Sequence, residues 1–351
     1  MSSPLTYVSS ADDVTLACAI SGSGPPLVLV PPVPFSNLVA EWESPLFGAV
    51  YRELGRRFTL IQYDGRGTGH SQRDVDDLSL DAMVGDLDAV VSAVGQGRVH
   101  LLGQYNSCPH ALAYAARNPQ RVDRVALFGG AARAWLHMSA KETQALLTLI
   151  EEDFDLFAES AAHRWLGWSA GDAGRVAAET FRSAVTPRVA RATMQAASAV
   201  DVTGLLQRVT APTLVLHRRE MPQIPLQVSR DLAEALPRGQ LAVLPGSQPA
   251  LFVEDTDSVV AMLIAFYADG AVPASLRDAP RPSAPSLPAG MSAREVEVLR
   301  LVAAGDSNGE IARQLSLSVH TVERHLANIY RKIDARGRAD ATAYALRNGL
   351  T

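Results

Sequence analysis

The sequence predicts a chain of two unlike parts, an α/β domain with a mostly parallel sheet and a helical cap, followed by a small all-α domain. Its 351 residues exceed the roughly 100–200 residues of a typical domain. Short apolar runs alternate with helical patterns along the first part, and a proline-rich stretch separates it from three closely spaced helix starts. We therefore assign the α/β domain to residues 1–267, a linker to residues 268–290 and the all-α domain to residues 291–351.

Six short apolar runs are the expected strands of the sheet. Several are almost continuously apolar, as is typical of parallel strands that are covered on both faces. The pattern becomes helical throughout about residues 131–207, between the fourth and fifth runs, which predicts a cap inserted into the sheet. The runs lie at residues 27–30, 58–62, 99–102, 124–128, 213–217 and 241–244.

The stretch at residues 268–290 reads ADGAVPASLRDAPRPSAPSLPAG, with five prolines and no apolar periodicity. Such a composition is typical of an extended linker. A surface loop within one domain is a weaker interpretation, because loops of this length without structure are uncommon in compact domains.

Composition and charge exclude several classes of protein. No apolar run approaches the roughly 20 residues that span a bilayer, and the N-terminus has neither the basic nor the apolar segment of a secretory signal. Cys18 and Cys108 cannot build a disulfide framework, so we expect the protein in a reducing cytoplasm. Only two of the 32 basic residues are lysine, which hints at a GC-rich bacterial genome. We expect neither a metal nor a cofactor.

The all-α part has the only charge balance that favours a polyanion, since it carries nine Arg and Lys against seven Asp and Glu, whereas the rest carries 23 against 30. Its helix starts follow the capping-box pattern, in which a serine hydroxyl accepts from the third helical amide and a glutamate there reaches back. Ser292 with Glu295 and Ser307 with Glu310 have this spacing, and Ser318 begins a third helix.

The third helix, residues 318–333, has two distinct faces. A face with Arg, Asn and His lies opposite an apolar stripe, as on a helix that enters a major groove. From this periodicity alone, a solvated helix in a small bundle is an equal alternative. The stripe consists of Val319, Val322, Leu326, Ile329 and Ile333, at spacings of 3, 4, 3 and 4 residues.

The tail closely resembles the LuxR/GerE-type helix-turn-helix over essentially all of residues 291–346. The resemblance implies that the 318–333 helix enters the major groove and that a helix at residues 338–348 helps two copies to dimerise. A homodimer would then read an inverted repeat in double-stranded DNA. The resemblance is carried by the string SAREVEVLRLVAAGDSNGEIARQLSLSVHTVERHLANIYRKI, above all by Glu295, Leu299, Gly305, Asn308, Glu310, Ile311, Ala312, Ser318, Thr321, Val322, His325, Leu326, Asn328, Ile329, Lys332 and Ala341.

The chain departs from this family at Gly309 and Glu323, where many members have lysine. Glu323 cannot bind phosphate, but a carboxylate accepts from cytosine N4, and Arg324 can read guanine O6 and N7. Four of the residues expected at the DNA are better placed for backbone phosphates, which set register rather than sequence. These four are Thr321, His325, Arg331 and Lys332, and the other expected contacts are Ser318, Glu323, Arg324, Ala327 and Asn328.

A glycine-rich turn, DGRGTGHS at residues 64–71, follows the second run. Its D-x-R-G-x-G-x-S pattern resembles the loop after the fourth strand of α/β-hydrolases. GPP before LVLV, APT before LVLH, and the late segment LPGSQPALFVED agree with this resemblance, which spans about residues 7–267. It implies an α/β-hydrolase fold in which the helical stretch is the cap.

Catalysis in that family needs a serine on a strained turn, a histidine base and an acid that orients it. Aligned by their neighbours, these three positions hold Tyr105, Pro249 and Met221. Ser107 and Cys108 lie near the first, but a shifted serine leaves the apex of the turn and no histidine stands at the base position. We therefore expect that the chain is not an enzyme.

The space between sheet and cap is then the expected site of a small, mostly apolar molecule with a few placed hydrogen-bonding groups. Pro31-Pro32 replaces the family's His-Gly beside the oxyanion hole, which removes donors there, while the next amide, that of Val33, remains. The alternative is that large side chains fill the old active site. The expected lining is Tyr105, Gln104, Asn106, Val33, Phe35, Trp135, Met221 and Phe252.

Together these patterns predict a ligand-responsive, DNA-binding transcription regulator whose catalytically degenerate α/β-hydrolase domain binds a small-molecule effector. Two alternatives stay open. One is a bifunctional, esterase-like α/β-hydrolase that also binds DNA. The other is a hydrolase-fold dimerisation platform without a ligand.

Overall fold

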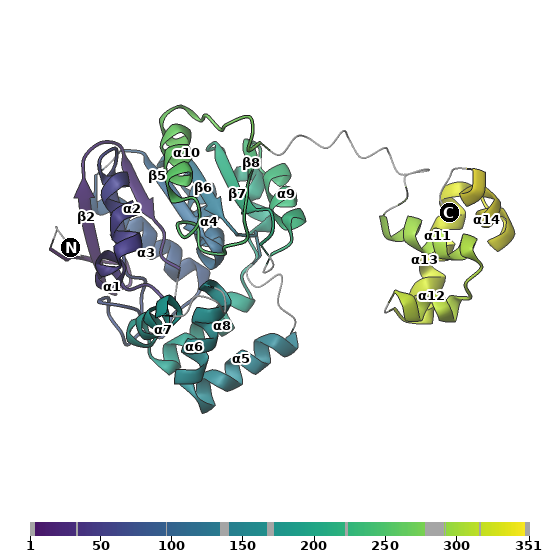
Figure 1. Cartoon of the computed structure of the whole chain (residues 1–351), viewed down its shortest axis with the longest axis horizontal. Coiled ribbons are helices and arrows are strands. Elements are labelled where there is room, and N and C mark those ends of the chain that lie inside the picture. The colour runs from purple at the N-terminus through teal and green to yellow at the C-terminus, as the bar shows by residue number, and fades with distance from the viewer. Residues whose placement is uncertain are drawn as a thin grey trace. The chain divides into compact units, whose positions relative to one another are not determined.

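The computed structural model describes residues 4–32, 34–95, 97–133, 140–166, 172–221, 224–277, 291, 293–315 and 317–347. The chain forms two compact units, Met1–Asp278 and Ala279–Thr351, with the elements labelled in Figure 1. Val33 and Trp135, both expected at the ligand site, and the capping residue Ser292 lie outside the described residues. No helix in the described ranges combines the length and the apolar character needed to cross a membrane.

The first unit is built on one eight-stranded sheet in the order β1-β2-β4-β3-β5-β6-β7-β8. Pairing is parallel from β4 to β8 across the sheet, whereas β2 pairs antiparallel with both β1 and β4. The predicted α/β class and all six predicted strands are confirmed. The strands are β1 (Thr6–Ser9), β2 (Thr15–Gly22), β3 (Pro26–Leu29), β4 (Thr59–Tyr63), β5 (Val99–Gln104), β6 (Val122–Phe128), β7 (Thr213–Arg218) and β8 (Gly239–Leu244).

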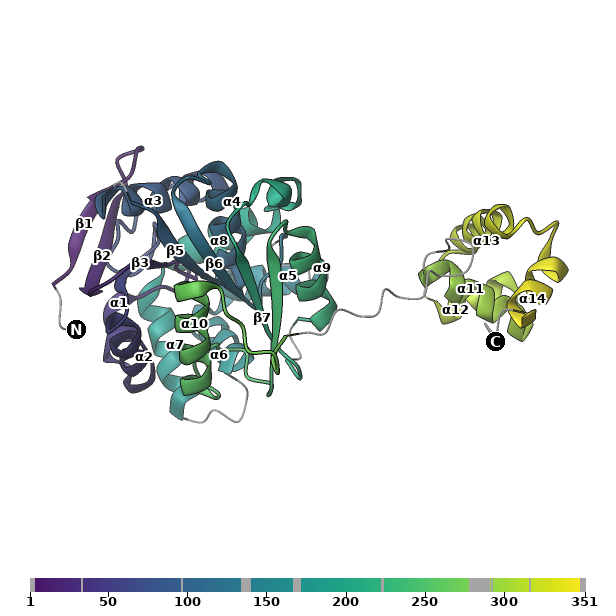
Figure 2. The same cartoon turned by 90° about the horizontal axis from the view of Figure 1, so that it is seen from above.

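Helices cover both faces of this sheet, as Figure 2 shows. Successive residues of a strand point to opposite faces, so Leu101 packs with the cluster on one side and Leu102 with the cluster on the other. This is why the strands read as continuous apolar runs. One layer holds α3 (Leu80–Ala93), α4 (Cys108–Arg117) and α9 (Leu226–Ala235), and the other holds α1 (Leu38–Glu43), α2 (Pro45–Gly55) and α10 (Thr256–Asp269).

The chain between β6 and β7 is helical, as predicted, and forms the cap. The cap is bonded to the glycine-rich turn, because the Gly69 amide donates to the Ala184 carbonyl at 2.7 Å. It is also bonded to the loop after β3, where the Asn37 side chain donates to Ser183 Oγ at 3.2 Å. The cap comprises α5 (Ala140–Glu152), α6 (Phe154–Leu166), α7 (Asp172–Ala184), α8 (Pro187–Ser198) and the short 3-10 helix η3 (Thr203–Arg208).

The start of the expected linker packs on the first unit. Val272 is buried, and the Val243 amide of β8 donates to the Leu276 carbonyl at 2.8 Å. These two apolar side chains in an otherwise proline-rich stretch explain why the unit continues to Asp278 rather than ending at residue 267. Residues 278–290, the remainder of the expected linker, lie outside the described residues.

The second unit is all helical. The Ser307 and Glu310 side chains make the predicted capping box at the start of its second helix, and the Ser318 hydroxyl accepts from the Thr321 amide at 3.1 Å. A core that includes Leu299, Val322 and Ile329 holds the helices together. They are α11 (Ala293–Ala304), α12 (Asn308–Gln314), α13 (Val319–Ile333) and α14 (Arg338–Arg347).

Candidate functional site

Tyr105 lies at the apex of the sharp turn between β5 and α4. Its φ is +50°, in the left-handed region that a non-glycine residue adopts only under constraint. The constraint comes from Ser107, whose hydroxyl accepts from the Gln104 amide at 2.8 Å and donates to the Gln104 carbonyl at 2.9 Å. Gly103 gives the turn room, because a Cβ there would lie 3.3 Å from the Cys108 Cα. The turn therefore has the strained geometry expected of a nucleophile position, with a tyrosine on it.

The three positions aligned with the catalytic triad meet in space. The Tyr105 hydroxyl donates to the Pro249 main-chain carbonyl and lies 3.3 Å from the Met221 sulfur. The ring packs edge-on against Phe128, with centroids 5.9 Å apart. Burial raises the pKa of the Tyr105 phenol above its usual value of 10.0. Neither Met221 nor Pro249 has a side chain that can take or give a proton, so this contact supplies no general base.

Arg218, at the end of β7, fixes the segment that brings Pro249 to Tyr105. Its buried guanidinium donates to the carbonyls of Pro245, at 3.0 Å, and Leu251, at 3.1 Å, and also to that of Glu254. The Glu254 carboxylate in turn accepts from two amides of the same segment, those of residues 247 and 248. This role of Arg218 was not predicted from the sequence, where its signal is a cation at the end of an apolar strand.

The glycine-rich turn at residues 64–71 stabilises the fold. Its Arg66 guanidinium is buried and pairs with Asp86 at 2.7 Å and Asp12 at 2.8 Å. The Asp64 carboxylate accepts from the Leu38 amide at 2.9 Å and from the amide of residue 70 at 2.8 Å. The Asp64 and Arg66 side chains of the D-x-R-G motif therefore bond the turn to α3, to α1 and to the β1–β2 hairpin.

The expected ligand-lining residues separate into two groups. Tyr105, Met221 and Phe252 pack in one cluster, where Phe252 is 1% exposed and serves as core. Phe35 instead stacks on Phe181 of the cap, with centroids 4.2 Å apart. The structure therefore does not gather these side chains around one opening. Gln104 contributes its backbone to the strained turn, and Asn106 borders a small cavity.

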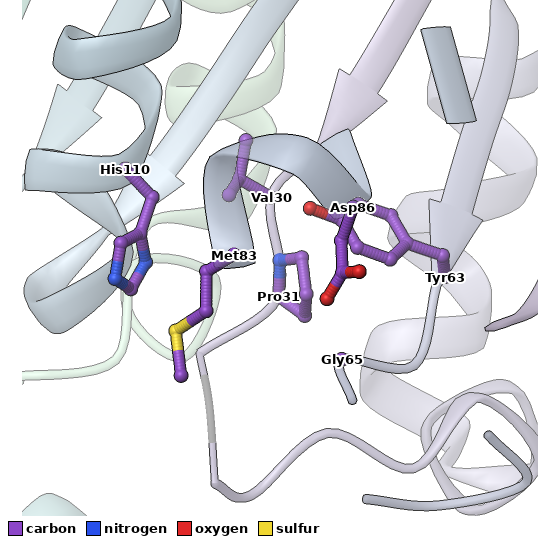
Figure 3. A pocket seen from close by; sticks show the side chains of 7 residues that line it. All are labelled: Val30, Pro31, Tyr63, Gly65, Met83, Asp86 and His110. Carbon is purple, nitrogen blue, oxygen red and sulfur yellow. The ribbon is translucent and has the colours of Figure 1, made fainter. Parts of the chain in front are cut away.

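Two small cavities lie next to the first turn of α4, each with a volume of about 10 Å³, roughly that of one water. Met83 and His110 border both of them, and Tyr105 borders neither. Figure 3 shows Met83, His110 and Pro31 around the first cavity. Burial lowers the pKa of His110 to about 4, so its imidazole is uncharged near neutral pH. The second cavity is bordered by Thr193 of α8, whose buried hydroxyl has no hydrogen-bond partner among the described residues.

Helix α13 of the second unit exposes most of the face predicted to meet DNA. Glu323, Arg324 and Ala327 are exposed, while Val322 and Leu326 of the opposite stripe are buried. Thr321, His325 and Asn328 are half-buried, Ser318 and Arg331 are exposed, and Arg331 Nη2 donates to Asn328 Oδ1 at 2.8 Å.

Two expectations for this helix differ from the structure. Val319, assigned to the apolar stripe, is 45% exposed, because it is the first residue of the helix and lies beyond the edge of the core. Lys332, expected at a phosphate, has its ammonium 2.7 Å from the carboxylate of buried Glu295 on α11. Its charge is therefore used to compensate a carboxylate within the unit.

Two family models match the chain. That of the alpha/beta hydrolase fold matches residues 26–256, and that of the bacterial regulatory proteins of the luxR family matches residues 289–345. The chain belongs to the alpha/beta hydrolase fold family. Its C-terminal unit is a LuxR-type DNA-binding domain, as the sequence predicted.

Relatives resemble one unit or the other. A putative carbamate hydrolase RutD of Variovorax paradoxus is 31% identical over 262 residues, 71% of this chain and 90% of that protein. The transcriptional regulatory protein LiaR of Bacillus subtilis is 42% identical over 60 residues, 17% of this chain and 28% of that protein. The quorum-sensing regulator RhlR of Pseudomonas aeruginosa is 45% identical over 75 residues, which cover 21% of this chain and 31% of that protein.

Solved structures show the same hydrolase fold. The enol-lactonase from Burkholderia xenovorans superposes with a TM-score of 0.65 at 20% identity, covering 75% of this chain and 100% of that one. The esterase RhEst1 from Rhodococcus superposes with a TM-score of 0.65 at 22% identity, covering 76% and 99%. At these identities the likeness concerns the alpha/beta hydrolase fold alone.

Proposed function

We propose that this chain is a transcription regulator whose α/β-hydrolase domain binds a small molecule without hydrolysing it. The observation that carries the proposal is the contact of Tyr105 with Met221 and Pro249, on a chain that also has a LuxR-type DNA-binding domain. Tyr105 is half-buried, the proton of its phenol is donated to a main-chain carbonyl, and no titratable side chain occupies the other two positions. Acyl transfer lacks both an activated nucleophile and a base there.

DNA recognition is assigned to α13, acting in a homodimer on an inverted repeat. Exposed Arg324 reads guanine in the major groove, and Glu323 accepts from cytosine N4. Ser318, Thr321, His325, Ala327, Asn328 and Arg331 complete the interface, in which phosphate contacts set the register. Lys332 contributes less than the sequence suggested, since its ammonium pairs with Glu295.

Ligand binding between the sheet and the cap would regulate this DNA binding. A ligand changes the presentation of the two DNA modules only through its differential affinity for two arrangements of the cap or of the dimer. The bonds of α7 to residues 37 and 69 are candidates for what shifts.

A second candidate function, a dimerisation platform without a ligand, is favoured by the small cavities. At about 10 Å³ each, they hold a water and not an effector unless side chains move. The two functions differ in one outcome, because a platform binds its DNA with the same affinity whatever small molecule is present.

The test is a hydrolysis assay run beside a DNA-binding assay on the full chain. Because relatives are named as carbamate hydrolases and similar folds as lactonases and esterases, the substrates are ethyl carbamate, a γ-lactone and 4-nitrophenyl acetate. We expect no turnover above buffer, and retained selection of an inverted repeat from a random duplex library. Turnover that disappears in Ser107→Ala or Cys108→Ala would establish the bifunctional hydrolase instead.

A further inference from the structure

The two small cavities beside α4 have features of a binding site that is separate from the triad positions. They share Met83 and His110 as walls, so they are neighbours. Methionine is unbranched and adapts its shape readily, so a rotation of Met83 can join the two volumes. The cap helix α8 borders the second cavity through Thr193 and Ala197, small side chains that leave room beneath them.

A buried hydroxyl group without a hydrogen-bond partner in the described part of the chain indicates that a ligand binds in this cavity. The Thr193 residue is 3% exposed, and its hydroxyl oxygen has no hydrogen-bond partner among the described residues. Buried hydroxyl groups are nearly always paired, and an unpaired one costs free energy. His110, 8% exposed, presents an imidazole to both cavities and can donate from one ring nitrogen and accept at the other.

We propose that the cavities around His110 and Thr193 form one effector site, closed by Met83 and roofed by α8, for a small uncharged molecule with a hydrogen-bond donor and an acceptor. This inference rests on the proposed function and names its site and ligand class. The ligand is uncharged because the charged groups beside the site, Asp86 and its partner Arg66, are already paired at 2.7 Å, so an ionic ligand would be buried without a counter-charge. Primary amides and small alcohols have this chemistry.

The site also provides a route to regulation. Helix α8 carries Thr193 near its middle and Arg188 near its start, where Arg188 pairs with Asp74 just beyond the glycine-rich turn. Arg191, between them, pairs with Glu151 of α5. A ligand that lifts α8 at Thr193 therefore acts on the same helix that is bonded to the body and to the rest of the cap.

The test uses the full chain with methyl-¹³C methionine, titrated with propionamide and, as a charged counterpart of similar shape, propionate. The Met83 resonance is assigned by its loss in Met83→Leu. We expect propionamide to shift the Met83 signal saturably and propionate to leave it unchanged. Thr193→Val, which keeps the side-chain shape, should weaken propionamide about five- to tenfold, while Tyr105→Phe should leave the affinity unchanged.

Thr193→Val should also raise the unfolding temperature of the ligand-free protein, because it removes an unpaired buried hydroxyl, and this distinguishes a ligand-binding role from a structural one. A Met83 signal that is indifferent to propionamide and to 1-propanol, or an affinity unchanged in Thr193→Val, overturns this site. An affinity lost in Tyr105→Phe moves the ligand to the triad positions and spares the proposed function. The proposed function itself fails separately, if the wild-type chain hydrolyses esters or selects no DNA.

Discussion

Tyr105 combines a strained backbone with a side chain whose hydroxyl is already hydrogen-bonded. A residue at φ +50° persists only where its surroundings determine it, and here Ser107 holds the turn while the phenol reaches Pro249. In a hydrolase this strain would present a nucleophile. In this chain it brings a large ring into contact with the two other triad positions, which links the turn after β5 to the segment after β8.

Tyr105→Phe should lower the free energy of unfolding by about 1–2 kcal/mol, because the Pro249 carbonyl loses its donor in a buried place. Urea denaturation of the full chain measures this. The matched control is Tyr7→Phe, at a tyrosine that is 59% exposed, which should change stability by less than about 0.5 kcal/mol. Equal effects of the two substitutions would mean that the Tyr105 hydroxyl contributes nothing.

Arg218→Lys should loosen the segment that carries Pro249, because an ammonium cannot reach three carbonyls from the position of a planar guanidinium. We expect a loss of about 1–3 kcal/mol in stability and faster hydrogen exchange at the amides of Ser247 and Gln248. Arg219→Lys, at the exposed next residue, is the control. Unchanged hydrogen exchange at these two amides in Arg218→Lys would mean that Arg218 does not hold the segment in place.

At the scale of elements, the sequence predicted the strands and helices whose apolar residues follow a regular pattern. The buried strands appear as apolar runs and α13 appears as a 3-4-3-4 stripe, because burial on both faces or on one face dictates those patterns. The β1–β2 hairpin was not predicted, since its exposed and mixed side chains lack a clear period. Alignment by neighbouring residues identified Tyr105, Met221 and Pro249 as the three triad positions. It did not identify Arg218, which fixes the segment that carries Pro249.

Long-range contacts account for the rest of what the sequence could not predict. His110 and Thr193 come from helices far apart in the chain, and only the packed cap brings them to one cavity. Lys332 looked like a phosphate ligand because its partner Glu295 lies 37 positions away. Phe252 looked like a lining residue, yet the sheet face beneath it makes it core.

Helix α13 carries basic residues with different roles, and Arg324 is the one that we expect to read a base. Arg324→Ala should relax sequence preference by about 1–3 kcal/mol at one base pair of each half-site. Binding titrations against a panel of single-base-pair variants of the selected site measure it. A uniform loss across all sequences would instead make Arg324 a phosphate contact.

Lys332→Ala should act on stability more than on DNA, because it removes an ion pair from the buried Glu295 carboxylate. We expect a lower unfolding temperature for the LuxR-type domain and an unchanged slope of log affinity against log salt. Arg331→Ala is the control on the same turn, and it should reduce that slope by about one. A reduced slope in Lys332→Ala would restore Lys332 to the DNA interface.

Glu41 of α1, which is hydrogen-bonded to Tyr51 of α2, makes the stability of the first unit depend on pH. Burial raises the pKa of Glu41 to about 7, even though the Tyr51 hydroxyl donates to its carboxylate at 2.6 Å. Because the folded pKa lies above the ordinary glutamate value of 4.5, ionising Glu41 costs stability, which is lost as the pH rises from about 4.5 to about 7. Relative to Glu41→Gln, the wild type should lose stability over that window in denaturation curves, and parallel curves would contradict this.

At the scale of the whole molecule, two units with different chemistry share one chain. The first keeps the α/β-hydrolase sheet, cap and strained turn, with a tyrosine, a methionine and a proline at the positions aligned with the triad. The second keeps the LuxR-type helices and exposes a face with Arg324 and Glu323. In the function that we propose, occupancy of the first unit by a small molecule controls DNA binding by the second.

Native mass spectrometry of the freshly purified full chain on its selected duplex, repeated after denaturation, detects the bound effector and the dimer on DNA in one experiment. We expect two chains per duplex and a small-molecule mass that is present natively and lost on denaturation. We also expect added ligand to change the population of the DNA complex. A mass that survives denaturation, attached at Tyr105, Ser107 or Cys108, would rule out a purely ligand-binding domain, because the α/β-hydrolase domain would then have performed covalent chemistry.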